Sequence, residues 1–333
     1  MLGSVRDSHR PANEGSAERG SLLFTFGGQG SQYFGMGASL VQHPVFAATA
    51  AELDAVCREL CGIKVLATVH DPSRSPTDRF DDLLVSSAAI FVTEYSLYQA
   101  LRAEGCQPDR LLGSSLGEIA ALAAGGLLAP ESALELLVDL SLVFETLCEP
   151  GGMTTILGDP DDFDALSARF PGLELVAANH SKHFVVGGPT SSLDGLEAEG
   201  SRRGLISFRL PVPFAFHTSR IEEARIAVTR LGQRFRFRVD TSDVLSGADG
   251  GVLTELDGVG LWRMVREPLA FVSIMRRLAD GGPVSVVDLT PQSTLCTLLK
   301  SALPQVTARP ILTPFGGELQ VVRSLGAELA GVR

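Results

Sequence analysis

The chain has 333 residues, of which 45% are hydrophobic and 20% charged, so it can bury the core of one large domain or of a domain with an inserted lobe. Twenty-eight Lys and Arg against 39 Asp and Glu give a formal net charge of -11, which argues against nucleic acid as a ligand. The five cysteines lack zinc-type spacing, so we expect neither a metal site nor a disulfide framework, and a reducing cytoplasm as the compartment.

Residues 1–20 are polar and rich in Gly, Ser and Arg, which is typical of a disordered tail. They lack the apolar centre of a signal peptide, and no apolar run reaches the roughly 18 residues of a spanning helix, so we expect no membrane association. The apolar residues 22–26 predict a buried strand. The glycine-rich turn GGQGSQYFGMG follows it and leads into a helix near Ser39.

The next part of the chain alternates helices with a strand. Residues 86–103 predict a long core helix, and RLLGSS is typical of a short strand that runs directly into the helix LGEIAALAAGGLL. Pro130 stands where a further helix begins, and the apolar residues after it recur at helical spacing. This alternation predicts an α/β fold.

Residues 152–212 form a candidate inserted lobe, because their patterns follow the order strand, helix, strand, strand, helix, strand. That order is the ferredoxin-like unit. We therefore expect a ferredoxin-like small subdomain at 152–212, inserted into an α/β-hydrolase-like large subdomain made of residues 21–151 and 213–333. Beyond the insertion, the amphipathic segment 261–282 and the apolar run VSVVDLTP return the chain to the large subdomain.

The sequence GSSLG offers a candidate nucleophile. Gly113, Ser115 and Gly117 match the G-x-S-x-G nucleophile elbow, in which a tight strand-to-helix turn exposes the central serine. The same turn would direct the N–H of Leu116 and the positive end of the new helix at an oxyanion. The alternative is a turn of small residues that serves packing alone.

A serine hydroxyl needs a base, and the chain has six histidines. His217 is the best candidate, since it follows PVPFAF where the chain leaves the inserted lobe. His180 and His183 belong to the predicted hairpin NHSKHF and fit turn or rim positions. A histidine after aromatic residues is equally compatible with a packed core residue, so the residues alone leave both interpretations of His217 open.

Four motifs occur in order between about residue 22 and residue 315: FTFGGQGSQYFGMG, GSSLGE, FAFHTS, and VREPLAF followed by VVDLTPQSTLCTLL. Together they resemble the malonyl-CoA:acyl-carrier-protein transacylase-like acyltransferases of fatty acid and polyketide synthases. The resemblance implies that Ser115 is the nucleophile and His217 the general base that later acts as acid. It also implies an oxyanion hole made by the backbone N–H groups of Gln29 and Leu116.

The resemblance implies further site residues. In this family a backbone carbonyl orients the histidine, and the EPLAF stretch near Ala270 matches that place. Asn179 matches an asparagine at the mouth of the active site, although a turn asparagine before a strand is equally compatible, and Phe216 of FAFHTS is assigned to the substrate pocket. No bound cofactor or metal is implied. The acyl donor would be the phosphopantetheine of an acyl carrier protein, the expected partner, or CoA.

Two departures from the family bear on the substrate. Malonyl-specific members resemble one another in a histidine directly before the nucleophile and in an arginine on the second helix after it. Here these positions are Ser114 and Leu140, and no Lys or Arg occurs between Arg110 and Arg169. A buried carboxylate without a cation costs several kcal/mol. We therefore expect a preference for acyl groups without a second carboxylate.

Short segments such as CEPGGMTTIL and DLTPQSTL are similar to a subgroup attached to polyketide synthases that lack built-in acyltransferases. Several members of that subgroup hydrolyse acyl groups from stalled carrier proteins. The expected function is therefore an editing acyl hydrolase that works through an acyl-serine. The alternatives are an acyltransferase that loads a starter unit and an inactive carrier-binding scaffold. An acidic carrier would need a basic docking face, for which the arginines around Arg202 and Arg276 are candidates or merely solvated side chains.

Overall fold

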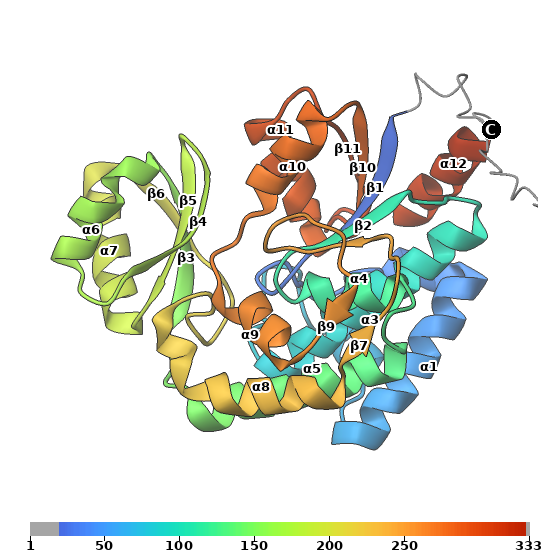
Figure 1. Ribbon diagram of the computed structural model, residues 1–333, viewed down its shortest axis with the longest axis horizontal. Helices are drawn as coiled ribbons and strands as arrows, with labels where there is room; N and C mark the ends of the chain where they lie inside the picture. The colour runs from blue at the N-terminus through green and yellow to red at the C-terminus, as the bar shows by residue number, and fades with distance from the viewer. Residues whose placement is uncertain (1–19, 331–333) are drawn as a thin grey trace, which may run out of the picture.

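The computed structural model describes residues 20–330, so apart from Gly20 the predicted tail lies outside the described residues. The larger of its two subdomains is built on a five-stranded parallel sheet with strand order β11-β10-β1-β2-β8 (Figure 1). The strands are β1 Ser21–Phe26, β2 Arg110–Gly113, β8 Val244–Leu245, β10 Val284–Asp288 and β11 Thr307–Pro310. A small antiparallel pair is formed by β7 Phe237–Arg238 and β9 Glu255–Leu256.

Helices cover both faces of the parallel sheet, which explains why β1 is mostly apolar, with apolar residues on both of its faces. Leu22 and Phe24 pack into the larger core, while Leu23 between them packs into a second core with Phe271 and Leu299. The helices are α1 Pro44–Cys61, α2 Val65–Val69, α3 Leu83–Ala103, α4 Gly117–Ala124, α5 Pro130–Leu147, α8 Arg225–Arg234, α9 Gly258–Arg266, α10 Phe271–Asp280, α11 Thr294–Ala302 and α12 Glu318–Ala330, with 3-10 turns η1 Ala38–Gln42, η3 Ser219–Ala224 and η4 Pro291–Ser293. Within residues 20–330, none of the helices has the length and apolar character needed to cross a membrane.

The small subdomain is a four-stranded antiparallel sheet with strand order β4-β5-β3-β6. Its elements are β3 Gly152–Leu157, η2 Pro160–Asp162, α6 Phe163–Arg169, β4 Glu174–His180, β5 His183–Gly188, α7 Thr190–Arg203 and β6 Ile206–Arg209. Leu193 and Leu196 of α7 share a separate core with Ile156 and Phe184 of the sheet. In Figure 1 both helices lie on the side of this sheet that faces away from the large subdomain. The predicted fold class, an α/β body with a ferredoxin-like insertion, is confirmed.

The amphipathic segment 261–282 is divided between two helices. The helix α9 ends at Arg266, and Glu267 has extended backbone angles, with φ -73° and ψ 149°. The reason is Pro268, because a proline disfavours helical angles in the residue before it. The carbonyl of Glu267 is therefore free to accept a hydrogen bond from outside the helix.

Candidate active site

The turn that carries Ser115 joins β2 to α4 and leaves no room for larger neighbours. Ser115 has a left-handed backbone, with φ 58°, which is unusual for a residue with a side chain. A Cβ atom on Gly113 would lie 2.2 Å from the backbone nitrogen of Glu118. One on Gly117 would lie 2.3 Å from the carbonyl oxygen of Phe26. The turn thus has the crowded geometry that the G-x-S-x-G pattern predicts.

His217 lies beside this serine, with its Nε2 atom 2.8 Å from Ser115 Oγ. Its Nδ1 atom lies 2.7 Å from the carbonyl oxygen of Glu267, which can only accept, so Nδ1 carries the proton and Nε2 is free to accept one from Ser115. Burial lowers the pKa of His217 to about 4; the Glu267 carbonyl opposes this shift and the charge of Arg266 adds to it. The imidazole is therefore neutral near pH 7, the form that a general base requires.

The carbonyl that contacts His217 Nδ1 belongs to Glu267, the first residue of the EPLAF stretch in which such a carbonyl was expected, and not to Ala270. The carbonyl of Ala270 instead accepts from the N–H of Ile274 and the hydroxyl of Ser273, both in α10. Ala270 also lines neither of the cavities beside Ser115. The physical reason is Pro268, which ends α9 and leaves the carbonyl just before it without a helical partner.

Two backbone N–H groups beside Ser115 are unoccupied. Within the described part of the chain, neither the N–H of Leu116 nor that of Gln29 has a hydrogen-bond acceptor. The side-chain amide of Gln29 donates to Ser87 Oγ at 2.7 Å. The glycine-rich loop lies directly against the elbow, because a Cβ atom on Gly28 would be 3.0 Å from Ser115 Cβ.

An inner cavity of about 50 Å³ extends from Ser115 into the large subdomain. Leu140 and Phe216, both predicted to line the pocket, are in its wall. The remaining lining comprises Gln29, Leu83, Ser87, Leu116, Ile119, Leu137, Ser141, Phe144, His217, Met264 and Val265. No Lys, Arg, Asp or Glu side chain is among these lining residues, so the cavity has no cation to pair with a carboxylate.

An outer cleft of about 420 Å³ reaches the same serine from the other side. It runs between the small-subdomain sheet, represented by Met153 and Val185, and α11, represented by Leu298. Ser115 and His217 line both the inner cavity and the outer cleft, so this hydrogen-bonded pair stands at their junction.

Two further predicted pocket residues, Ser114 and Asn179, are absent from the wall of the inner cavity. Ser114 lines the outer cleft and not the inner cavity, because the elbow turns adjacent side chains in different directions. Asn179 lines neither space. Its amide nitrogen lies 3.0 Å from Nδ1 of His183, and His183 is the residue that lines the cleft.

Two buried glutamates beside the site were not predicted from the sequence. Glu94 in α3 accepts a hydrogen bond from the N–H of Gly27 in the glycine-rich loop, and burial raises its pKa well above the usual value. Glu118, the last residue of GSSLGE, accepts from the N–H of Gly247, and burial raises its pKa to about 8. The available signal for Glu94 was that it is the only charged residue between positions 86 and 101.

With this geometry, the chain belongs to the acyl transferase domain family, whose family model matches residues 23–317. The family resemblance inferred from the four motifs is therefore confirmed. Among its relatives is the polyketide biosynthesis acyltransferase homolog PksD of Bacillus subtilis, which is 33% identical over 303 residues, covering 90% of this chain and 94% of PksD. The homolog BaeD of Bacillus velezensis is 31% identical over 89% of this chain and 93% of its own length.

Solved structures agree in fold. The loading acyltransferase of the avermectin modular polyketide synthase is 25% identical and superposes with a TM-score of 0.82, covering 93% of this chain and 100% of its own. The malonyl CoA-acyl carrier protein transacylase of Coxiella burnetii superposes with a TM-score of 0.75 at 21% identity, covering 92% and 98% of the two chains. At this identity, the similarity to the Coxiella burnetii structure shows a shared fold only.

Proposed function

We propose that this protein is a serine enzyme of polyketide biosynthesis that removes an uncharged acyl group from a carrier-protein thioester and passes it to water. The observation that carries the proposal is the Ser115–His217 hydrogen bond of 2.8 Å, placed where an uncharged inner cavity meets an outer cleft. The names of its full-length relatives PksD and BaeD, both polyketide biosynthesis acyltransferase homologs, support the pathway assignment.

The first half-reaction forms an acyl-serine. His217 Nε2 takes the hydroxyl proton as Ser115 Oγ attacks the thioester carbonyl carbon. The N–H groups of Gln29 and Leu116 then bind the oxyanion, and each such donor is worth roughly 3 kcal/mol in the transition state. The carbon–sulfur bond breaks, and the leaving thiolate takes the proton from His217. The free thiol and an acyl-Ser115 ester are the products.

The second half-reaction releases the acyl group. A water molecule gives a proton to His217 as its oxygen attacks the ester carbon, and the same two N–H groups bind the new oxyanion. The carbon–Oγ bond breaks and Ser115 recovers its proton from His217. The products are a carboxylic acid and the free enzyme.

The inner cavity determines the acyl group in this proposal. Since one water needs about 10–15 Å³ on the same measure, a cavity of about 50 Å³ suits a short acyl chain. Leu140 occupies the position where a malonyl-specific member would present arginine. A second carboxylate would therefore be buried without a partner, at a cost of several kcal/mol.

The outer cleft is the proposed channel for the phosphopantetheine arm of the carrier protein, with CoA as the alternative donor. Its lining includes polar side chains that suit the amides of such an arm, among them Gln292, Thr294 and Thr297. Two arginine clusters, around Arg202 and Arg276, were considered as docking sites for the carrier protein. Arg202 forms an ion pair with Glu199 at 2.8 Å, which partly neutralises its charge.

The test is incubation of the protein with acetyl-loaded and malonyl-loaded carrier protein, followed by mass spectrometry with and without a second, unloaded carrier protein. The proposal predicts loss of acetyl in the absence of an acceptor, and slow or no loss of malonyl. Loading of the second carrier would instead identify a transferase. Absence of both reactions, with Ser115 unmodified, would identify a scaffold.

A further inference from the structure

The segment that carries His217 is held by contacts on both sides of the histidine. His217 has a left-handed backbone, with φ 61°, a conformation that persists only where the surrounding structure enforces it. Its N–H donates to the carbonyl of Val265 at 3.1 Å. The next residue, Thr218, is fully buried, and its hydroxyl donates to the carbonyl of Ala215. These contacts lie within the large subdomain and the loop that leads to it.

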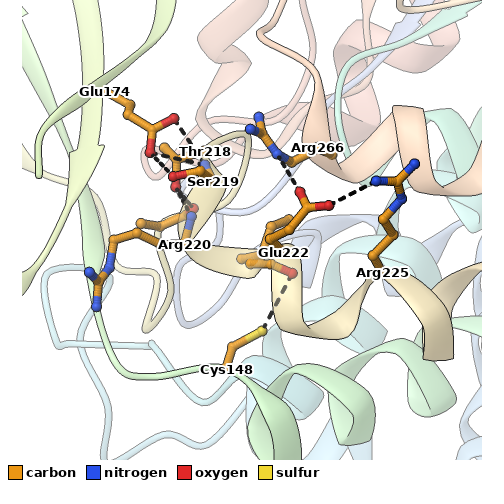
Figure 2. A network of polar contacts seen from close by, with 10 residues as sticks. Cys148, Glu174, Thr218, Ser219, Arg220, Glu222, Arg225 and Arg266 are labelled. Atoms are coloured by element: carbon orange, nitrogen blue, oxygen red, sulfur yellow. Dashed lines mark hydrogen bonds and ion pairs between the residues drawn. The ribbon is translucent and has the colours of Figure 1, made fainter.

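A further contact comes from the small subdomain. Glu174, the first residue of β4, extends its carboxylate to Ser219, two residues after His217 (Figure 2). Both carboxylate oxygens accept from the Ser219 N–H, at 3.0 and 2.9 Å, and Oε1 also accepts from the Ser219 hydroxyl. Ser219 begins η3, which continues into α8, so the negative charge also faces the positive end of a helix.

The same strand also contacts the segment that carries Glu267. The pairing of β4 with β5 shifts register between Leu175 and Ala177, which leaves Val176 as a bulge. The carbonyl of Val176 accepts from the N–H of Leu269 at 2.8 Å. Leu269 lies two residues after Glu267, whose carbonyl receives the Nδ1 proton of His217. One strand of the small subdomain thus contacts the segments on both sides of the imidazole.

The carboxylate of Glu174 has no competing partner among the described residues. The nearby guanidinium groups are paired elsewhere. Arg220 pairs with Glu149 at 3.1 Å, and Arg266 pairs with Glu222 at 3.4 Å (Figure 2). Within residues 20–330, Glu174 forms no ion pair with Lys, Arg or His. Ser219 is thus the residue to which the Glu174 side chain is hydrogen-bonded within the described part of the chain.

We propose that Glu174 is a positioning residue for the base: by fixing Ser219 it sets the orientation of His217, and through it the small subdomain controls the reactivity of Ser115. The inference rests on the proposed role of His217 as base. It adds that the small subdomain, besides forming a wall of the cleft, is mechanically tied to the catalytic pair. Two contacts make this connection: the hydrogen bonds of Glu174 to Ser219, and the hydrogen bond from the N–H of Leu269 to the carbonyl of Val176.

The experiment measures how fast a fluorophosphonate labels Ser115 across pH, because this reagent reports activation of the serine by His217 without any acyl donor. We expect Glu174→Ala to lower the labelling rate at neutral pH about tenfold or more, since a misplaced base loses much of its typical 10²–10⁴-fold contribution. The pH midpoint of the acidic limb should also rise above about 4. A less constrained imidazole is better hydrated, and hydration raises the pKa of His217 back toward its ordinary value. The charged and titratable groups near that imidazole are Arg266 with its partner Glu222, and His183 in the cleft.

Two further variants separate positioning from general damage. Glu174→Gln keeps one acceptor oxygen for Ser219 and should recover part of the rate. Asp194→Ala is the matched control: it breaks an exposed ion pair of the small subdomain, with Arg209, but leaves Ser219 and Arg220 in place, so rate and pH limb should stay as in the wild type. If Glu174→Ala does not fold, Ser219→Ala removes the hydroxyl contact alone and should produce a smaller effect in the same direction.

Folded Glu174→Ala with an unchanged labelling rate and an unchanged acidic limb would overturn the inference. So would an equal loss in Asp194→Ala. If the wild-type protein removes acyl groups from no carrier protein but Glu174→Ala still lowers the labelling rate of Ser115, the proposed function is refuted and this inference stands. Wild-type protein that is not labelled at Ser115 at all would overturn both.

Discussion

Ser114 and Ser115 are neighbours in the chain, but the elbow gives their hydroxyls different surroundings. Ser115 bonds to His217 at the junction of the two spaces, whereas Ser114 lines only the outer cleft. Ser115→Ala should therefore abolish acyl-enzyme formation, observed as an added acyl mass on the intact protein. Ser114→Ala should change the acylation rate by less than about tenfold, because it removes no group that reacts. An acylated Ser115→Ala protein would refute the nucleophile assignment.

The buried position of His217 makes a prediction about pH. A pKa lowered to about 4 means that the imidazole is mostly neutral, and able to accept a proton, from about one pH unit above that value. The rate constant of single-turnover acylation should be nearly flat from about pH 5 to about pH 8 and fall below about pH 4. A midpoint near the ordinary histidine value of about 6.5 would contradict the burial argument.

The side chain at position 140 tests the assignment of the inner cavity. Leu140→Arg places a cation in a cavity wall that lacks one, and a charge-assisted hydrogen bond is worth about 1.5–3 kcal/mol. The ratio of malonyl to acetyl acylation should rise about tenfold or more in competition assays that mass spectrometry reads out. Leu140→Met, which conserves volume, should leave the ratio unchanged. A folded Leu140→Arg protein with the wild-type ratio would show that the acyl group lies elsewhere.

At the scale of elements, the elbow depends on how closely β1, β2 and α4 approach one another. Gly117 begins α4, and an added Cβ would stand 2.3 Å from a carbonyl oxygen of β1, which cannot move without disturbing the sheet. Gly117→Ala should therefore lower the free energy of unfolding by about 2 kcal/mol or more, measured by urea denaturation.

The control for this substitution is Gly251→Ala, because its nearest atom is the carboxylate oxygen of Asp249, at the end of a flexible side chain 3.3 Å away. It should cost less than about 0.5 kcal/mol, as surface substitutions usually do. Equal losses in the two variants would show that the crowding of the elbow is unimportant.

The elements themselves were largely predictable from local patterns. The residues of β1 and α3 carry continuous or helically spaced apolar residues, and the order of patterns in the insertion matches the observed small sheet. The short strand β8, of two residues, was not predictable, because it carries too little periodicity to be seen. The break between α9 and α10 could be predicted from Pro268. That this break leaves the Glu267 carbonyl free to contact His217 could not be predicted from the sequence.

At the scale of the whole molecule, the site joins segments that are far apart in the chain. Ser115 and His217 are separated by 102 positions, with the small subdomain between them. The proposed base lies where the chain returns from the insertion, and residues near both ends of the small subdomain, Met153 and Leu210, line the cleft beside Ser115. The contacts of Glu174 and Val176 then connect the inserted sheet back to the histidine.

Local constraints make part of this protein predictable from its amino-acid order. A tight strand-to-helix turn requires small residues around an exposed serine, so the pattern at 113–117 predicts Ser115 as nucleophile, and the family motifs predict His217 as its base. The carbonyl of Glu267, the cleft position of Ser114, the place of Asn179 and the lowered pKa of His217 were decided only by the tertiary fold. Each of these depends on distances and burial between segments remote in sequence, and a hydrogen bond or a desolvated imidazole exists only once those segments have packed together.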